Sequence, residues 1–549
     1  MSAGGDDQVT RNKDDSMKFV DSLLDMKLQD TVLDQQATED LAARCLAKFD
    51  DTEADPKCRA ISLYTLLAQI RAGNVSMLPL IPDLCQRLKA SSVLTQPVTD
   101  AAAEDFHRQI INTISVILDL SPEKLVDESF GAAMHYLVQL VSCKHVEIAI
   151  MACKFWAKYA GISANITIRK HWLSLLFPEM SLLIKALMDQ MIYHPAYAEH
   201  IEKFGSRCLN AAASEESLPG NVEAFVNLRN LAAVAFEHVV RVYPADLVCA
   251  TFRPLLEKRI ESDSWPEKEA VILALAAFTQ GGGTPDAMRD SYSLLIPRVL
   301  DCYADPHPLL RSVACLAMPK LVGRQLRGVK DPWSRVLTST ARATRDSSAA
   351  VRRTAIHALS SLLAYGTPSG AAGPSSGVGD HTGKLVDALV RADQYDMDPD
   401  TRCVYFECVS HLVGRTNGWL TAADMDRLMP PLIDAWRSQP WDRAMDAKKT
   451  GSIIDPDLGI VPFSVALGTI ATYGKSLFIP FAESVFEKAC TDIKGCVFNI
   501  PNISASSTDR DNILSYVRFR ATVRTDDALL SCSYCVVSLL YCCCNAFNK

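Results

Sequence analysis

The sequence lacks the features of a membrane or secreted protein. No apolar run reaches the roughly 20 residues that a helix needs to span a bilayer. Residues 1–16 are polar and acidic, which argues against a secretory leader. Most of the 18 cysteines stand singly in apolar runs, as at Cys153, Cys315 and Cys408, where a thiol packs as a small hydrophobic side chain. We therefore predict a protein of a reducing compartment, with no membrane insertion.

Motifs for catalysis and for phosphate binding are also absent. The sequence contains no H-E-x-x-H, no G-x-S-x-G and no G-x-x-x-x-G-K-[ST]. Gly281-Gly282-Gly283 follows a helical pattern, so we interpret it as a helix stop rather than a phosphate cradle. These absences predict a protein that is not an enzyme and that needs neither a cofactor nor a metal ion.

The charge is mildly acidic, with a net value of -8. Proteins that neutralise nucleic-acid phosphates over their whole surface carry an excess of Lys and Arg, which this chain lacks. We expect no nucleic-acid partner. A mildly acidic surface is compatible with basic protein partners.

The apolar residues that are present follow the period of a helix. The clearest segment runs Leu228, Leu231, Ala232, Ala235, Phe236, Val239, Val240. Small residues in similar helical contexts recur at Ala152, Ala232, Ala270, Ala314 and Ala355. The steps between them are 80, 38, 44 and 41 residues, and we interpret the first as two repeat units.

A period near 40 residues is typical of HEAT or armadillo repeats. Proline steps, as at Pro82, Pro254, Pro297, Pro430 and Pro480, are interpreted as the first turn of the second helix of each unit. Two helices per unit favour HEAT. The predicted fold is all-α, an α-solenoid whose inner helices form a continuous trough for an extended polypeptide.

The predicted organisation has three parts. Residues 1–16 are expected to be disordered, and residues 17–503 to form the solenoid, with loops at 205–222 and 366–383. Residues 504–549 form an irregular tail with one C-x-x-C, Cys532 to Cys535, and a Cys542 to Cys544 run. A structural zinc site would need two such pairs, so zinc binding, palmitoylation and an unfolded tail all remain open.

An ordered series of segments between Asp34 and Lys494 resembles the transportin (karyopherin-β2) group of the importin-β superfamily. The series includes the helix that ends at Trp156, Asn227-Leu228-Arg229, Leu310-Arg311-Ser312, and Met429-Pro430-Pro431-Leu432 before Trp436. The resemblance implies a nuclear import receptor that shuttles between cytoplasm and nucleus under control of Ran. Implied partners are cargo proteins with basic Pro-Tyr-type nuclear localisation signals, Ran and Phe-Gly nucleoporins.

The resemblance also implies where the cargo signal binds. Carried over residue by residue, it places the site at Val234, Glu237, Leu273, Val313, Leu316, Val404 and Glu407. Glu237 and Glu407 would bind cargo arginines, and Val234, Leu273 and Val313 would form an apolar floor for the Pro-Tyr end. Leu316 stands where the family has a tryptophan that packs on that element.

Two further departures from the family pattern follow. Residues 205–222 correspond to a long acidic loop, but their acidic residues are Glu215 and Glu216 alone. The chain also lacks counterparts of the family's amino-terminal repeats and of its carboxy-terminal half, so we expect a partial receptor with weakened or lost Ran binding. The alternative is a HEAT scaffold that assembles another protein complex and takes no part in transport.

Overall fold

The described part of the chain is helical. The computed structural model describes residues 35–71, 80–90, 101–120, 131–162, 177–204, 220–281, 286–325, 330–365, 378–392, 399–416 and 419–437, and the single positions 470, 477, 480 and 481. Within these ranges there is no β-strand, and no helix is long and apolar enough to cross a membrane. The all-α prediction is confirmed.

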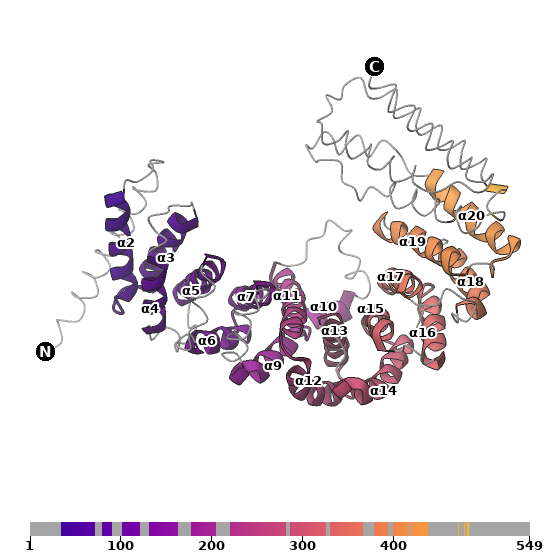
Figure 1. The fold of residues 1–549 in the computed structure, drawn as a ribbon, viewed down its shortest axis with the longest axis horizontal. Helices are drawn as coiled ribbons and strands as arrows, with labels where there is room; N and C mark the ends of the chain where they lie inside the picture. Colours follow the sequence, from indigo (N-terminus) through magenta and orange to yellow (C-terminus); the bar gives the residue numbers. More distant parts are fainter. Residues whose placement is uncertain are drawn as a thin grey trace, which may run out of the picture. The chain divides into compact units, whose positions relative to one another are not determined.

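The chain divides into two compact units, Met1–Leu295 and Ile296–Lys549. In unit 1, a first layer of helices packs side by side in the order α3, α5, α7, α11, α13, and a second layer in the order α4, α6, α9, α12 (Figure 1). The first layer and the preceding helix are α2 (Gln35–Asp50), α3 (Pro56–Arg71), α5 (Ala101–Leu120), α7 (Val146–Ile162), α11 (Gly220–Val242) and α13 (Trp265–Gly281). The second layer and its neighbours are α4 (Ile81–Ala90), α6 (Gly131–Val141), η5 (Phe177–Glu179), α9 (Met180–Gln190), α10 (Pro195–Phe204) and α12 (Ala245–Ile260).

Unit 2 repeats the two-layer arrangement. Its first layer packs in the order α15 (Pro308–Gln325), α17 (Ala349–Tyr365), α19 (Pro399–Thr416). Its second layer packs in the order α16 (Lys330–Ala343), α18 (Thr382–Ala392), α20 (Ala422–Arg437). The short helices η7 (Cys302–Ala304) and η8 (Gly379–His381) precede α15 and α18, and α14 (Asp286–Asp301) contains the boundary between the units. Stacked helix pairs in each unit confirm the HEAT solenoid class.

The core of each unit lies between its two layers. The five alanines of the sequence pattern all fall in first-layer helices, and each is at most 2% exposed. In unit 1, Phe252 of α12 packs between Phe236 of α11 and Phe278 of α13, with ring centroids 5.3 and 5.0 Å apart. Trp156 is fully buried in α7 and donates a hydrogen bond to the Leu137 carbonyl (3.4 Å), so it packs neighbouring helices together. Such apolar burial is the main source of stability in stacked repeats.

The step from Ala152 to Ala232 is one repeat, not the two units that the spacing predicts. Helix α11 packs directly against α7, so the two alanines lie on neighbouring first-layer helices. The additional length lies between α9 and α11, where the chain adds α10 and the residues up to Gly220. Counting residues could not distinguish an enlarged repeat from two ordinary ones.

The proline steps are mostly not helix starts. Pro82 lies in the first turn of α4 as predicted, but Pro254, Pro297 and Pro430 lie inside α12, α14 and α20. A proline removes one backbone hydrogen bond and bends a helix. These three side chains are exposed, so water can bond the carbonyl that each proline leaves without its partner. In these three helices the prolines of the sequence pattern therefore mark a solvent-facing position rather than a helix start.

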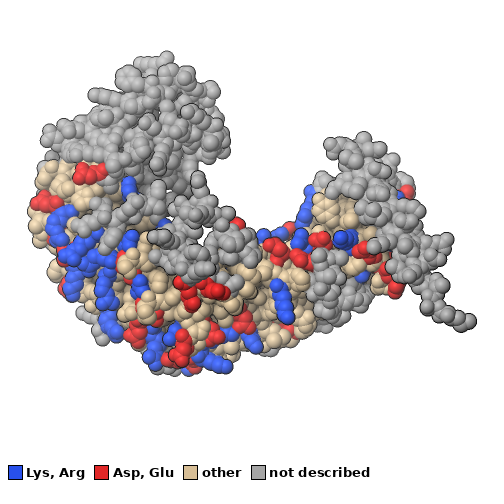
Figure 2. All heavy atoms as spheres, turned by 180° about the vertical axis from the view of Figure 1, so that it is seen from behind, with Lys and Arg blue, Asp and Glu red and all other residues tan. Residues whose placement is uncertain are grey.

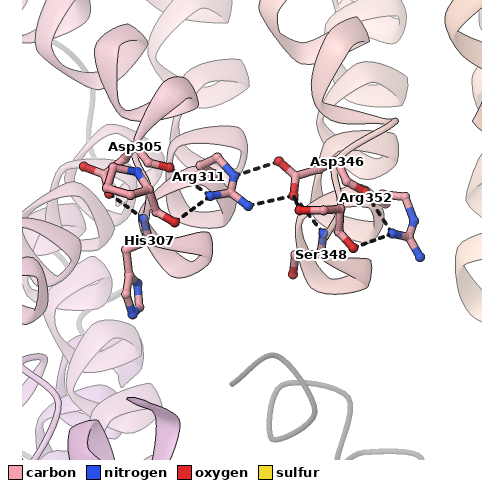
Figure 3. A network of polar contacts seen from close by, with 8 residues as sticks. Asp305, His307, Arg311, Asp346, Ser348 and Arg352 are labelled. Carbon is pink, nitrogen blue, oxygen red and sulfur yellow. Dashed lines mark hydrogen bonds and ion pairs between the residues drawn. The ribbon is translucent and has the colours of Figure 1, made fainter. Parts of the chain in front are cut away.

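An arginine near the start of several first-layer helices binds the turn before it. In unit 2, Arg311 donates to the carbonyls of Asp305 and Pro306, and to both carboxylate oxygens of Asp346 at 2.7 and 2.8 Å (Figure 3). Arg352 repeats the pattern on the carbonyls of Asp346 and Ser347. Arg311 therefore connects α15 to the turn before α17, whereas Arg352 fixes the turn before its own helix.

Several predicted boundaries lie wholly or partly outside the described residues. These are the predicted disordered residues 1–16, the tail 504–549, and the loop residues 205–219 and 366–377. At the other end of each loop the chain is already helical, because α11 begins at Gly220, and η8 and α18 cover residues 379–383.

Candidate peptide-binding surface

Helix α11 of unit 1 presents a stripe of side chains to solvent. Its exposed and half-exposed residues recur every third or fourth position: Glu223, Asn227, Asn230, Val234, Glu237 and Arg241. The opposite face, with Leu228, Ala232, Phe236 and Val240, is buried. The predicted residues Val234 and Glu237 both lie on this stripe, and Val234 is 43% exposed.

Glu237 is held in place by two contacts. Its side chain is 18% exposed, and its Oε1 accepts a hydrogen bond of 2.5 Å from Nη2 of Arg241, one turn along α11. Its main chain lies against the end of α13, where a Cβ atom on Gly281 would come within 2.4 Å of the Glu237 carbonyl oxygen. Glycine at 281 therefore allows the close approach of α13 to α11. The carboxylate is presented by a packed helix pair rather than by a loop.

Helix α13 offers little accessible surface beside this stripe. Residues 269–279 are buried except for Leu273, which is half-buried. Glu269 forms an ion pair with Arg229 of α11. The pair is buried between the helices, because the Glu269 side chain is 5% exposed and the Arg229 side chain 12%. The Arg229 guanidinium also lies over the Tyr193 ring, 4.2 Å from its centroid. This acid belongs to the contact between repeats, and Leu273 contributes a small apolar area.

In unit 2, the first predicted residues lie on α15. Leu316 is 39% exposed, on a stripe with Pro308, Ser312 and Lys320. Val313 is only 4% exposed. It follows the stripe residue Ser312 by one position, a rotation of about 100° around a helix of 3.6 residues per turn. Val313 therefore packs inside the unit and cannot form the accessible apolar floor expected of it.

Helix α19 carries the remaining predicted residues of unit 2. Val404 is half-buried and Glu407 is exposed, and both share a face with His411. Burial lowers the pKa of His411, and the nearby Glu407 carboxylate opposes this shift without reversing it. Nδ1 of His411 lies 3.2 Å from the Ser360 hydroxyl. His411 is therefore neutral at neutral pH, so it does not neutralise Glu407. The face combines one accessible carboxylate with an aliphatic side chain.

Sequence reasoning missed other residues of the first layer in unit 1. Asn227 and Asn230 lie on the α11 stripe, and an amide side chain can both donate to and accept from a peptide main chain. Tyr64 of α3 and Leu120 of α5 are 45% and 47% exposed. The amide pair could have been found from its spacing in the helical pattern. The exposure of Tyr64 and Leu120 depends on how neighbouring helices pack, which the pattern does not contain.

Within the described ranges, no cluster of three or more His, Cys, Asp or Glu could hold a metal ion. The strongly perturbed groups lie in the packing. Burial lowers the pKa of His107 to about 4 and its Nδ1 meets the Tyr136 hydroxyl, while burial raises the pKa of Cys153 to about 12.

Comparison with known proteins shows which proteins have similar sequences. No protein-family model matches the chain. Transportin-1 of Oryza sativa subsp. japonica is 23% identical over 370 residues, which cover 62% of this chain and 38% of the relative. Importin subunit beta-2 of Saccharomyces cerevisiae is 21% identical over 429 residues, which cover 71% of this chain and 42% of the relative. The chain is therefore similar to transportin and importin subunit beta-2 over about two thirds of its length.

Solved karyopherin structures have the same fold. A crystal structure of importin beta superposes with a TM-score of 0.61 at 10% identity, covering 91% of this chain and 52% of that one. Kap121p bound to Nup53p superposes with a TM-score of 0.52 at 12% identity, covering 90% of this chain and 45% of that one. The chain spans about two fifths of the length of the curated relatives, transportin-1 and importin subunit beta-2. The relatives bear the names of transport receptors rather than of enzymes.

Proposed function

We propose that this chain is a karyopherin, a nuclear import receptor that binds basic localisation signals of cargo proteins on the outward stripes of its first-layer helices. The observation that carries the proposal is the α11 stripe, where Val234, Glu237 and two asparagines lie together on a rigid, solvent-facing helix. Aliphatic, acidic and amide groups are what an extended basic peptide requires. The relationship to transportins supports the same function.

Glu237 and Glu407 are the proposed partners of cargo arginines, one in each unit. A carboxylate accepts two parallel hydrogen bonds from a guanidinium, and a hydrogen bond to a charged group contributes about 1.5–3 kcal/mol. Glu237 has the stronger case, because Arg241 and the α13 contact already restrict its side chain and main chain. A preorganised acid loses less conformational entropy on binding.

Leu316 is the proposed apolar contact in unit 2, with Val404 on α19 beside Glu407. A leucine cannot stack on a tyrosine ring as an aromatic side chain does, and such stacking is worth about 0.5–1.5 kcal/mol. We therefore propose that the cargo range depends more on basic residues than on a Pro-Tyr end.

The second layer is the proposed site for Phe-Gly nucleoporin segments. In unit 2, Trp419 is 46% exposed and its indole lies on the backbone of Gly379, where an added Cβ atom would be 2.8 Å from the ring. In unit 1, Leu182 of α9 is 50% exposed. Kap121p, which has the same fold, has been crystallised with Nup53p. Movement between cytoplasm and nucleus, and release of cargo by Ran, complete the proposed cycle.

The test is the affinity of a fluorescent basic peptide ending in Pro-Tyr for the full chain, measured by anisotropy. We expect Glu237→Lys with Glu407→Lys to weaken binding at least tenfold, because each change replaces an attraction with a repulsion. The matched control, Glu53→Lys with Glu199→Lys, makes the same change in net charge at exposed positions of the α2–α3 turn and α10. Equal affinities for wild type and the Glu237/Glu407 variant would refute the site.

A second peptide, with Ala-Ala in place of Pro-Tyr, separates the two parts of the signal. We expect less than a threefold loss for it, given Leu316. The scaffold alternative predicts a different result. The chain would bind neither peptide, would not respond to GTP-loaded Ran and would copurify with one fixed partner.

A further inference from the structure

Unit 2 carries a group of arginines on its second layer, away from the first-layer residues described above. This arginine cluster consists of Arg342 in the last turn of α16, Arg345 in the turn after it, Arg391 at the end of α18 and Arg427 of α20. Arg342, Arg391 and Arg427 are exposed and Arg345 is half-buried. Because α18 packs against both α16 and α20, the four side chains come from three adjacent helices and the turn after α16.

One carboxylate lies within the cluster. Asp387 of α18 forms an ion pair with Arg427, in which the two side chains are 48% and 45% exposed. The Arg427 hydrogen bond is the main reason that the pKa of Asp387 is lowered, and the charges of Arg427, Arg391 and Arg345 lower it further. Arg345, Arg391 and Arg427 therefore all lie within electrostatic reach of the same carboxylate.

The nearby acid Asp346 does not balance the remaining charge. Both of its oxygens are taken by Arg311, and Oδ1 also accepts from the Ser348 amide (Figure 3). On α16, the turn after it and α18, Arg342, Arg345 and Arg391 outnumber Asp387, so positive charge is in excess there, while α20 carries Asp424 and Asp426 near Arg427. Figure 2 shows Lys and Arg side chains gathered over this part of unit 2, although the whole chain has a net charge of -8.

The spacing of the cations indicates the form of the ligand. Two further exposed cations, Arg335 on α16 and Lys384 on α18, lie seven positions before Arg342 and Arg391, which is about 10 Å along a helix at 1.5 Å per residue. Packed helices are also about 8–10 Å apart. An extended polypeptide advances about 3.3 Å per residue, so acids at every third position would match this spacing.

Nucleic acid fits the cluster less well. A DNA duplex carries one charge per about 1.7 Å of its axis, so its close contacts would bring phosphates onto Asp387 as well as onto the arginines. A peptide with spaced carboxylates can place a neutral residue at Asp387. Arginine, whose planar fork pairs with a carboxylate in a bidentate way, is well suited to such a ligand.

We propose that the arginine cluster of unit 2 binds an extended acidic segment of a partner protein, with carboxylates at about every third residue. This site differs from the proposed cargo surface in layer, in charge and in ligand. It does not depend on the chain being an import receptor.

The test uses the full chain and three fluorescent probes at about 50 mM salt: a Glu-Gly-Ser repeat of twelve residues, a peptide of the same composition with its glutamates contiguous, and a DNA duplex. We expect the repeat to bind best. The variant Arg342→Gln, Arg345→Gln, Arg391→Gln should lose about tenfold in affinity for it, because three exposed ion pairs with the peptide are removed and each contributes modestly.

The matched control, Lys57→Gln, Arg71→Gln, Lys185→Gln, removes the same charge from exposed positions of unit 1 and should change the affinity less than twofold. Asp387→Asn should raise it two- to threefold, because it removes a repelling carboxylate that pairs with Arg427. Circular dichroism checks that each variant is folded. Unchanged binding by the arginine variant would overturn the proposal, and so would tighter binding of the duplex than of the peptide.

Discussion

At the scale of single residues, side-chain direction decides which of the predicted site residues are accessible. The resemblance to the transportins supplied positions, and a position on the α11 stripe, such as Val234, is accessible, whereas Val313 on α15 is not. One residue along a helix changes the direction by about 100°. The period of the buried alanines predicts that direction near Ala232, but residues 313–319 of α15 are all apolar and the pattern gives no preferred face there.

Gly281 gives a residue-scale prediction. We expect Gly281→Ala to destabilise unit 1 by about 1–3 kcal/mol, because its Cβ atom would meet the Glu237 carbonyl oxygen at 2.4 Å and the two backbones must separate. Gly383→Ala in α18 is the control, since nothing lies within 4 Å of its Cβ position, and alanine should stabilise that helix by up to about 1 kcal/mol. Relative to wild type, the urea midpoint of unfolding should fall for Gly281→Ala and rise for Gly383→Ala. Midpoints that shift in the same direction would contradict the account.

At the scale of elements, the sequence predicted where helices occur better than which helices pack against each other. The alanine pattern identified five first-layer helices correctly, because their buried faces repeat with the helix period. The pattern could not place Pro254 inside α12, since a proline suits both a first turn and a bend on a solvent face. Nor could it show that α11 packs on α7, because that contact joins residues separated by α9 and α10.

The pair Arg311 and Asp346 gives an element-scale prediction, because it joins α15 to the turn before α17. Burial raises the pKa of Asp346, but the hydrogen bonds from Arg311 and Ser348 outweigh it, so the net shift is downward. The pair is therefore stabilising above the unfolded-state pKa of about 4, and this contribution is lost as pH falls through the lower folded-state pKa.

We expect Asp346→Asn to destabilise unit 2 by about 1–3 kcal/mol at pH 7, since both side chains of the pair are less than 15% exposed. The difference from wild type should shrink below about pH 4. Asp387→Asn, which breaks an exposed pair, should cost at most about 1 kcal/mol at either pH. Thermal unfolding at pH 7 and pH 3.5 measures both, and a loss from Asp346→Asn that stays constant with pH would contradict this account.

At the scale of the whole molecule, composition gives only the net charge, whereas the structure shows where the charged side chains lie. A net charge of -8 predicts an acidic surface, yet unit 2 gathers arginines on its second layer while accessible acids lie on first-layer helices of each unit. The helix period and the repeat length were enough to predict the solenoid class, because every repeat shows the same sequence pattern. The assignment of a surface to a partner needs exposure and neighbours, which exist only once the helices are packed.

The central claim is that a basic peptide binds along the α11 stripe of the first layer, and site-specific photocrosslinking tests it most directly. A benzophenone side chain at Val234 should crosslink to the basic Pro-Tyr peptide, and an excess of unlabelled peptide should suppress the product. The same group at Leu182, equally exposed on the second layer of unit 1, should give little product. Crosslinking at Leu182 but not at Val234 would contradict the account.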